Sequence, residues 1–451
     1  MSDKSIHIMT QYRQSFHSSV VMIAAGVLLA GCASASDNPP SASQPSAPNS
    51  STDQEPQLLA LSGNALSALP PTESAKITAY LANRAPANAI VANVTLNNDI
   101  FDCVLINEQL SIRKLKAQGA NFVLHHAPSS ILPAPTAPVT SAAGTMPLAN
   151  EALQATNVHC PDATVPVKRI QPTQIAAWGT LDNYLHRSPP NVGQHDHAAD
   201  WFSTTNYGAE SRINIWNPYI ENSGEFSISQ IWVQTTYNNL IQSVEAGVQR
   251  WYGGNTEFFI YYTPDGYASG AYNDDDGTFI QTDNSVYLGG DFSNYSSFNG
   301  TQWDQFIGIM KDGLVENGDS GDWWIRFADK WVGYWPTTLF GWETGTLGAN
   351  AATRFAFGGE VYDNRATGHT GTNMGSGLAP YLGYQNAAYQ KKLRYYPYVG
   401  GGGYNWSDVD VLSNTGQAEQ PNCYSQAYTT HDLNWSDYIF FGGAGRNASC
   451  P

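Results

Sequence analysis

Two runs of sequence, SISQIWVQTTY at residues 227–237 and LIQSVEAGVQR at residues 240–250, carry the pattern that decides the fold. Both are short and rich in β-branched and aromatic residues, which favour strands. Similar runs, such as TEFFIYYTPDG and RFAFGGEVYD, alternate with Gly, Asn and Asp turns from about residue 175 to residue 451. This spacing indicates a mainly β protein, an antiparallel sandwich or barrel. The sequence has no fixed-period repeat, which argues against a propeller or a solenoid.

Side chains alternate between the two faces of a strand, and this alternation singles out two glutamates. In the run at residues 240–250, Glu245 shares a face with Gly247, while Val244, Ala246 and Val248 point to the other face, which would be core. In RFAFGGEVYD, Glu360 shares a face with Gly358, and the phenylalanines take the core face. From the pattern alone, two solvated surface glutamates are the simpler interpretation.

The composition excludes several classes of function. The chain has 451 residues, with 38 Asp and Glu against 21 Lys and Arg and a formal net charge of −17. Aromatic residues reach 12% and charged residues only 13%, so most of the chain should fold. Nucleic acid is not expected as a partner, because phosphate contacts need a basic face and no Lys/Arg cluster occurs. The sequence has no GxSxG, HExxH or P-loop motif, and we expect no cofactor.

The N-terminus has the features of a targeting segment. The apolar run VVMIAAGVLLA is too short to span a membrane as a stable helix and predicts a lipoprotein-type signal peptide at residues 1–31. The following LAGC resembles a bacterial lipobox, in which Cys32 would be lipidated; cleavage at Ala33 or Ala35 is the alternative. Residues 32–57 are rich in Pro and Ser and predict a flexible tether. We therefore expect an outer-membrane lipoprotein or a secreted protein, with membrane contact only through the lipid.

Four cysteines remain once Cys32 is set aside, and an even number in an exported protein implies disulfides. Three pairings are open, and proximity in sequence favours Cys103 with Cys160 and Cys423 with Cys450. The absence of a CxxC motif argues against a zinc or redox site built on cysteine.

Residues 58–175 differ in pattern from the rest and predict a small mixed α/β unit. TESAKITAYLANRA, which starts at Thr72, is typical of a helix, and AIVANVTL and FDCVLI are typical of strands. The β-rich unit would then span residues 176–451.

Several motifs together resemble the neprosin family of glutamic peptidases in order and spacing: SVEAGVQRWYGG, FIYYTPDGY, WWIRFADKWVGYWPTTLF, FGGEVYD and TNMGSG. The resemblance runs from about Ala199 to the C-terminal GGAGRNASCP, and FDCVLINEQ resembles the family's activation segment. A bacterial member of this family would fold as an antiparallel β-sandwich of two bent sheets with a concave catalytic groove. The resemblance also implies that residues 58–175 are an inhibitory prosegment and residues 176–451 the catalytic domain.

The resemblance also implies the catalytic site. The family's catalytic glutamates lie in its EAG and GGE motifs, which here are Glu245 and Glu360. Two close carboxylates cannot both ionise cheaply, so one would hold a proton while the other activates water, which predicts activity at acid pH. Similarity to fungal glutamic peptidases, which have Gln and Glu, favours Glu360 as the general base. The candidate substrate-binding residues are Gly247, Gly358, Tyr262, Tyr267 and Trp335.

The implied function is an exported glutamic endopeptidase that hydrolyses protein or peptide substrates and is made as a self-processed zymogen. The family's peptidases favour proline near the cleaved bond, and the sequence leaves open whether this chain shares that preference. Pro172 and Pro190 lie in the region where processing is expected. Two alternatives stay open. One is a carbohydrate-active hydrolase, which also uses paired carboxylates, and the other is a non-catalytic surface binding module on the same fold.

Two polar segments need separate interpretation. Asp274, Asp275 and Asp276 lie where family members often have a cysteine pair, and they could bind calcium through carboxylate oxygens. A solvated turn is the preferred interpretation. His195 and His197 would share a strand face and could bind a metal. Because no third ligand is evident, we expect a surface or local structural role and assign no metal site.

Overall fold

A computed structural model of the chain describes residues 65–128, 146–154, 158–187, 193–312, 321–397 and 405–451. The expected signal peptide, the lipidation site at Cys32 and the Pro/Ser-rich tether lie outside these ranges. Within them, no helix combines the length and the apolar character needed to cross a membrane.

The first part of the described chain forms a small mixed α/β unit, as its sequence predicts. Three strands pair in the order β1 (Ile90–Leu96), β2 (Asp99–Leu105) and β4 (Thr164–Lys168). The α-helices are α1 (Pro71–Arg84), α2 (Leu110–Ala117), α3 (Pro172–Ala176) and α4 (Leu181–His186). Helix α1 starts on a proline, which is favourable because the first helical residue needs no N–H donor.

The helical layer extends beyond the predicted boundary between residues 175 and 176. Helix α3 spans that boundary, and Ile77 of α1, Ile175 of α3 and Tyr184 of α4 share one buried cluster. The apolar packing of this unit therefore continues through α4 rather than ending at residue 175.

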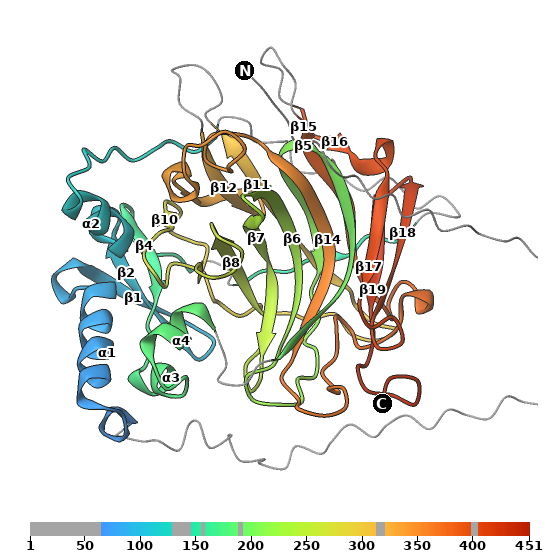
Figure 1. Cartoon of the computed structure of the whole chain (residues 1–451), viewed down its shortest axis with the longest axis horizontal. Coiled ribbons are helices and arrows are strands. Elements are labelled where there is room, and N and C mark those ends of the chain that lie inside the picture. Colours follow the sequence, from blue (N-terminus) through green and yellow to red (C-terminus); the bar gives the residue numbers. More distant parts are fainter. Residues whose placement is uncertain (1–64, 129–145, 155–157, 188–192, 313–320, 398–404) are drawn as a thin grey trace, which may run out of the picture. The chain divides into compact units, whose positions relative to one another are not determined.

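Sixteen of the described strands form one large curled sheet, almost entirely antiparallel (Figure 1). This agrees with the predicted mainly β class. Its longest path runs β10-β13-β12-β11-β5-β14-β6-β7-β8-β9, and β15 to β19 and β3 pair beside this path. The strands are β3 (Asn150–Glu151), β5 (Gln194–Asn214), β6 (Phe226–Tyr237), β7 (Leu240–Trp251), β8 (Glu257–Thr263), β9 (Ala271–Tyr272), β10 (Ile280–Gln281), β11 (Trp303–Asp312), β12 (Asp322–Phe327), β13 (Lys330–Trp335), β14 (Ala352–Asp363), β15 (Ala388–Pro397), β16 (Ser407–Asp408), β17 (Asn414–Ala418), β18 (Ser425–Asp432) and β19 (Ser436–Gly442).

Short 3-10 helices connect several of these elements: η1 (Ala65–Ala68), η2 (Ala87–Ala89), η3 (Ile106–Glu108), η4 (Thr337–Phe340), η5 (Pro380–Leu382) and η6 (Val409–Val411).

Strand β5 explains why the two expected sheets are continuous. It is 21 residues long. Its first half pairs with β14 and β17, and its second half pairs with β11 and β15. The register on β14 shifts between Ala352 and Arg354, where the pairing of β5 with β14 becomes irregular. One long strand therefore takes part in both layers, and their hydrogen bonding is unbroken.

The residues of the main core confirm the predicted alternation of side chains along β7 and β14. Val244, Ala246 and Val248 of β7 belong to it, as do Phe355 and Phe357 of β14. The glutamates that alternate with them therefore lie on the other side of the sheet.

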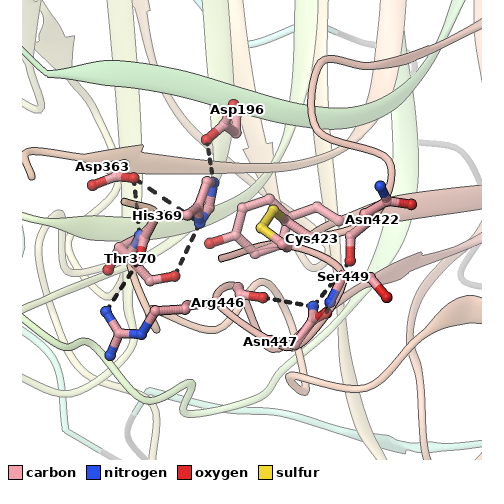
Figure 2. The surroundings of a disulfide bond; sticks show 12 residues. Asp196, Asp363, His369, Thr370, Asn422, Cys423, Arg446, Asn447 and Ser449 are labelled. Atoms are coloured by element: carbon pink, nitrogen blue, oxygen red, sulfur yellow. Dashed lines mark hydrogen bonds and ion pairs between the residues drawn. A yellow bond between two sulfur atoms is a disulfide. The ribbon is translucent and has the colours of Figure 1, made fainter. Parts of the chain in front are cut away.

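Both disulfides have the pairing that proximity favours, Cys103–Cys160 and Cys423–Cys450, each with Cα atoms 5.4 Å apart. The first lies within the mixed α/β unit and its following segment, and the second lies within the C-terminal part of the large sheet. Figure 2 shows Cys423 close to His369 and Arg446.

Candidate active site

The register of three neighbouring strands brings the two glutamates toward one another across β6. Glu245 of β7 is opposite Trp232 of β6, and Glu360 of β14 is opposite Ile228 of β6. Between these positions, Gln230 of β6 has a glycine on each side, Gly247 in β7 and Gly358 in β14. Figure 1 shows these long strands side by side. Two residues 115 positions apart in sequence therefore flank one glutamine.

The glycines make room for Gln230 and for backbone contact within the sheet. A Cβ atom on Gly247 would lie 2.2 Å from the carbonyl oxygen of Ser229, and one on Gly358 would lie 2.3 Å from that of Ala198. Neither position would accept a side chain without backbone movement. The amide nitrogen of Gln230 lies 3.4 Å from a carboxylate oxygen of Glu360, and the Gln230 side chain also lowers the pKa of Glu245. Gln230 is thus the polar link between the carboxylates.

Glu245 has neutral partners. It is 5% exposed, and its Oε1 accepts hydrogen bonds from the hydroxyls of Ser243 at 2.7 Å and Tyr267 at 2.8 Å. Burial raises its pKa to about 7, and the nearby charge of Glu360 adds to the rise while the two hydroxyls oppose it. Because Oε1 accepts two hydroxyl protons, the proton of a neutral Glu245 belongs on Oε2.

Glu360 has basic partners. It is 7% exposed, its Oε1 lies 2.5 Å from Nδ1 of His195, and its Oε2 lies 3.6 Å from Nε2 of His197. Burial would raise the pKa of Glu360, but the charge of His197 and the hydrogen bond from His195 outweigh burial and hold the pKa below its usual range. Close to neutrality, Glu360 is therefore the ionised member of the pair and Glu245 the member that takes up a proton.

His195 and His197 lie beside Glu360, which the sequence analysis did not predict. His195 and His197 do share a face of β5, as the spacing predicts, but they contact Glu360 rather than forming a separate surface feature. His197 also bonds Glu419, with 3.3 Å between Nδ1 and Oε1. Burial lowers the pKa of His197, but the charges of Glu360 and Glu419 raise it to about 9. His197 is therefore cationic at neutral pH and stabilises the ionised form of Glu360.

Of the predicted aromatic groove residues, only Tyr267 contacts the pair. Tyr262 and Trp335 pack in the main core with ring centroids 5.7 Å apart. Tyr262 is opposite Val244, a core residue, so it lies on the side of the sheet away from Glu245. The expectation that these two rings form groove walls is wrong, because strand alternation directs them into the core.

Other aromatic side chains lie on the glutamate face of the sheet. A separate buried cluster contains Phe226, Ile228, Phe259, Tyr261, Tyr272 and Tyr362, with Trp251 packed against it. Tyr261 is opposite Glu245 in the pairing of β7 with β8. This aromatic cluster is the apolar surface beside the carboxylates.

A group of buried metal-ligand side chains lies behind the site. Asp196 lies between His195 and His197 in sequence but points to the opposite face of β5, where its carboxylate lies 2.9 Å from Nε2 of His369. Asp363 lies 4.0 Å from the other ring nitrogen (Figure 2). One ligand atom from each of the three side chains lies within 4.8 Å of the others, so their spacing would allow a shared ion. The hydrogen bond between Asp196 and His369 ties the segment after β14 to β5.

The acidic segment that follows β9 is not a solvated turn. Asp275 is 3% exposed and pairs with Arg84 at 2.9 Å and Arg187 at 2.6 Å. Asp274 pairs with Arg84 at 2.5 Å. Asp276 accepts a hydrogen bond of 3.0 Å from the hydroxyl of Tyr262. The preferred interpretation of this segment is therefore wrong, because cations from the mixed α/β unit cover two of its carboxylates.

Sequence reasoning found the two glutamates and Tyr267 but missed Gln230, Ser243, His195 and His197 as their partners. Ser243 is two residues from Glu245 and so points to the same face of the strand. Gln230 lies on a strand with a similar sequence pattern, so alternation alone would have placed both side chains on the polar face. The histidines gave no comparable signal, since the pairing of β5 with β14 joins residues 165 positions apart.

Comparison with known proteins gives one match to a family and several distant similarities. Residues 223–444 match the family model described as Neprosin. The crystal structure of scytalido-glutamic peptidase with a transition state analog inhibitor has a TM-score of 0.28 and 8% sequence identity, over 56% of this chain and 100% of that chain. The structure of SCP-B, described as a member of the Eqolisin family of peptidases in a complex with the tripeptide Ala-Ile-His, has a TM-score of 0.26, 8% identity and the same coverage. Similarities at these scores carry no weight for the assignment of residues.

Proposed function

Because residues 223–444 of this chain form a domain of the neprosin family, we propose that the protein is a glutamic endopeptidase with Glu245 and Glu360 as its catalytic pair. The observation that carries the proposal is the opposite electrostatic setting of the two buried carboxylates. Histidines keep Glu360 ionised, whereas burial among hydroxyls raises the pKa of Glu245 to about 7. Such separation of two titratable groups is how acid and base roles are assigned in one site.

In the proposed reaction, Glu360 is the general base, and protonated Glu245 is the hydrogen-bond donor to the developing oxyanion. Glu360 takes a proton from a water molecule while the water oxygen attacks the carbonyl carbon of the peptide. Negative charge develops on the carbonyl oxygen, and the proton of Glu245 stabilises it through a hydrogen bond. When the tetrahedral intermediate collapses, the C–N bond breaks and the proton held by Glu360 passes to the leaving nitrogen. Both carboxylates then return to their starting states.

This division of roles fixes the pH range of activity. Glu360 must be ionised and Glu245 protonated, so activity should rise as pH passes the lowered pKa of Glu360 and fall as pH passes about 7. The proposed enzyme is therefore active in acid. An activity that stays constant up to pH 8 would contradict the requirement for a protonated Glu245.

A preference for proline near the cleaved bond is part of the proposal. The aromatic cluster beside Glu245 offers flat apolar surfaces suited to pyrrolidine rings. Proline-rich chains are also pre-extended, so they lose less conformational entropy on binding than other peptides.

We further propose that the mixed α/β unit is an inhibitory prosegment removed by self-cleavage. Support comes from its contacts with the aromatic cluster, where Trp178 lies edge-on to Trp251 with 5.6 Å between ring centroids. Pro172 occupies the first position of helix α3, and a peptidase does not cleave within an intact helix, so we propose a cut beyond α4 and Arg187. Pro190, the other candidate, lies outside the described residues. If the double variant with both glutamates changed to glutamine were processed at the normal rate, self-cleavage would be excluded.

Export and lipidation at Cys32 are proposed from the sequence alone. A Cys32→Ser variant should move from the membrane fraction to the soluble fraction of the envelope. An unchanged distribution would reject the lipid anchor and leave the proposed peptidase activity unaffected.

The decisive test of the function is digestion of a peptide library at pH 3 to 5 by the full chain after acid incubation. We expect cleavage by the wild type and none by Glu245→Gln or Glu360→Gln. Circular dichroism should show that both variants are folded. A folded variant with full activity would remove that residue from the pair, and a wild type that cleaves no peptide would overturn the proposed function.

A further inference from the structure

Two guanidinium groups lie against acidic and aromatic side chains at the edge of the sheet near Glu245. Arg187, the residue after α4, contacts Asp275 through Nη2 and Oδ2 at 2.6 Å. Its Cζ lies 5.6 Å from the centroid of the Tyr272 ring. Arg84 of α1 bonds both Asp274 and Asp275. We call the surface formed by Asp274, Asp275 and Tyr272 the acidic seat.

The acidic seat lies at the edge of the sheet nearest to Glu245. Tyr272 of β9 is opposite Tyr261 of β8, which is opposite Glu245 of β7. The three side chains share one face, and the rings of the two tyrosines are 4.8 Å apart. Two strand spacings amount to about 10 Å, the length of about three residues of an extended peptide. A peptide whose cleaved bond lay at Glu245 could therefore extend to the seat within about three residues.

The cations in the seat come from the segment that self-cleavage would remove. Arg84 and Arg187 both precede the proposed cut, whereas Asp274 and Asp275 follow it. Asp276 differs, because its partners Tyr262 and Thr278 belong to the large sheet and its loop and would stay in place. Release of the prosegment would thus remove the cations paired with Asp274 and Asp275 and leave both carboxylates free to pair with another cation.

We propose that the acidic seat of the processed enzyme binds an arginine or lysine side chain of the peptide substrate, about three residues from the cleaved bond. The inference rests on the proposed function. Its evidence is Arg187 of the same chain, which occupies the seat in the structure as a substrate side chain would after processing. A guanidinium suits it better than an ammonium. The planar fork can bond two carboxylate oxygens, and the face of Tyr272 interacts favourably with a delocalised cation.

The test uses the full chain after acid incubation and a matched set of peptides. At each of five positions on either side of the cleaved bond, one peptide carries arginine and its partner carries citrulline, which has the same shape without the charge. We expect kcat/KM to favour arginine by at least tenfold at one position. The preference should fall to within twofold in Asp275→Asn, with the citrulline peptides cleaved as before. Asp329→Asn, which removes a charge in the turn between β12 and β13, should keep the preference.

Each other result decides against the seat. Equal cleavage of every arginine and citrulline pair by the wild type would overturn the proposal while leaving the peptidase intact, and this comparison needs no variant to fold. A preference that survives in Asp275→Asn would place the basic subsite elsewhere. Loss of the preference on adding 1 mM calcium chloride (about the range of weak extracellular sites) would assign the carboxylates to a metal instead. Failure to cleave any peptide would reject the proposed function, and the seat with it.

Discussion

The proposed catalytic pair and the acidic seat are two groups of carboxylates whose partners come from different sources. Glu245 and Glu360 are held by Ser243, Tyr267 and His195, all on strands of the large sheet or the loop after β8. The carboxylates of the acidic seat are held by Arg84 and Arg187, which precede β5. The hydrogen-bond partners of the first group would stay in place if the N-terminal unit left, whereas the cations of the second group would leave with it.

In the proposed function, the first group carries out the reaction and the second controls when the enzyme becomes active. A catalytic pair needs fixed partners, because its pKa values must be the same in every turnover. A pair of carboxylates covered by removable cations changes state once, when those cations leave. Substitutions in the first group should therefore change the rate or the pH dependence of cleavage, and substitutions of the cations of the second group should change processing.

The largest effect is expected from removal of the proposed general base. Glu360→Gln should lower kcat by about 10²- to 10⁴-fold, the usual contribution of general acid–base catalysis, because glutamine cannot accept the proton of water. Stopped assays at pH 4 with a proline-containing peptide would measure it. Glu343→Gln, which changes an exposed glutamate outside both groups, is the matched control and should retain wild-type activity.

The next effect concerns the cations of the seat. Arg84→Met should weaken docking of the N-terminal unit, because breaking a buried ion pair and leaving one partner behind costs about 3–5 kcal/mol. Processing at a fixed acid pH should therefore be faster, as followed by the half-time of appearance of the shorter chain on gels. Lys76→Met removes an exposed cation of the same helix, paired only with Glu73, and should process like the wild type. Equal half-times for the two variants would show that the seat does not hold the unit.

A smaller effect is expected from the histidine beside Glu360. The charge of His197 lowers the pKa of Glu360, so His197→Gln should raise that pKa and move the acid limb of the pH profile of kcat to higher pH. The alkaline limb, which reports Glu245, should move less. A pH–rate profile measures both limbs. A uniform loss of rate without any shift would show that His197 acts only on the fold.

The smallest effect is expected at Tyr267. Its hydroxyl donates to Glu245 and so lowers the pKa of that carboxyl against the effect of burial. Tyr267→Phe should therefore raise the pKa of Glu245 further and shift the alkaline limb to higher pH, with the acid limb unchanged. A shift to lower pH would contradict the direction of this hydrogen bond.

Local sequence patterns predicted the fold class and the faces of the key strands, because both follow from alternation along single strands. Val244 and Val248 had to be core if Glu245 was not, and they are. The same rule, applied to Tyr262, would have put it in the core with Val244. It was instead expected in the groove because aromatic rings suit substrate binding, and packing proved the stronger demand.

Partners that lie far apart in sequence could not be predicted in this way. His195 reaches Glu360 only because the register of β5 on β14 places Gln194 opposite Asp363, and no local pattern specifies a register between distant strands. The cations on Asp275 come from residues 84 and 187, and nothing around residues 274–276 indicates them. Such contacts depend on tertiary structure, which a single sequence does not display.

The two disulfides determine what a cut after Arg187 would achieve. Cys103–Cys160 lies wholly before that point and Cys423–Cys450 wholly after it, so no covalent bond would join the two products. Before the cut, the N-terminal unit faces the sheet at the effective concentration of a tethered partner, which is in the millimolar range for short linkers. After the cut, the same contacts must hold two separate molecules at their actual concentration. Dilution alone would then favour dissociation, and once diffusion has separated the products inhibition would not return.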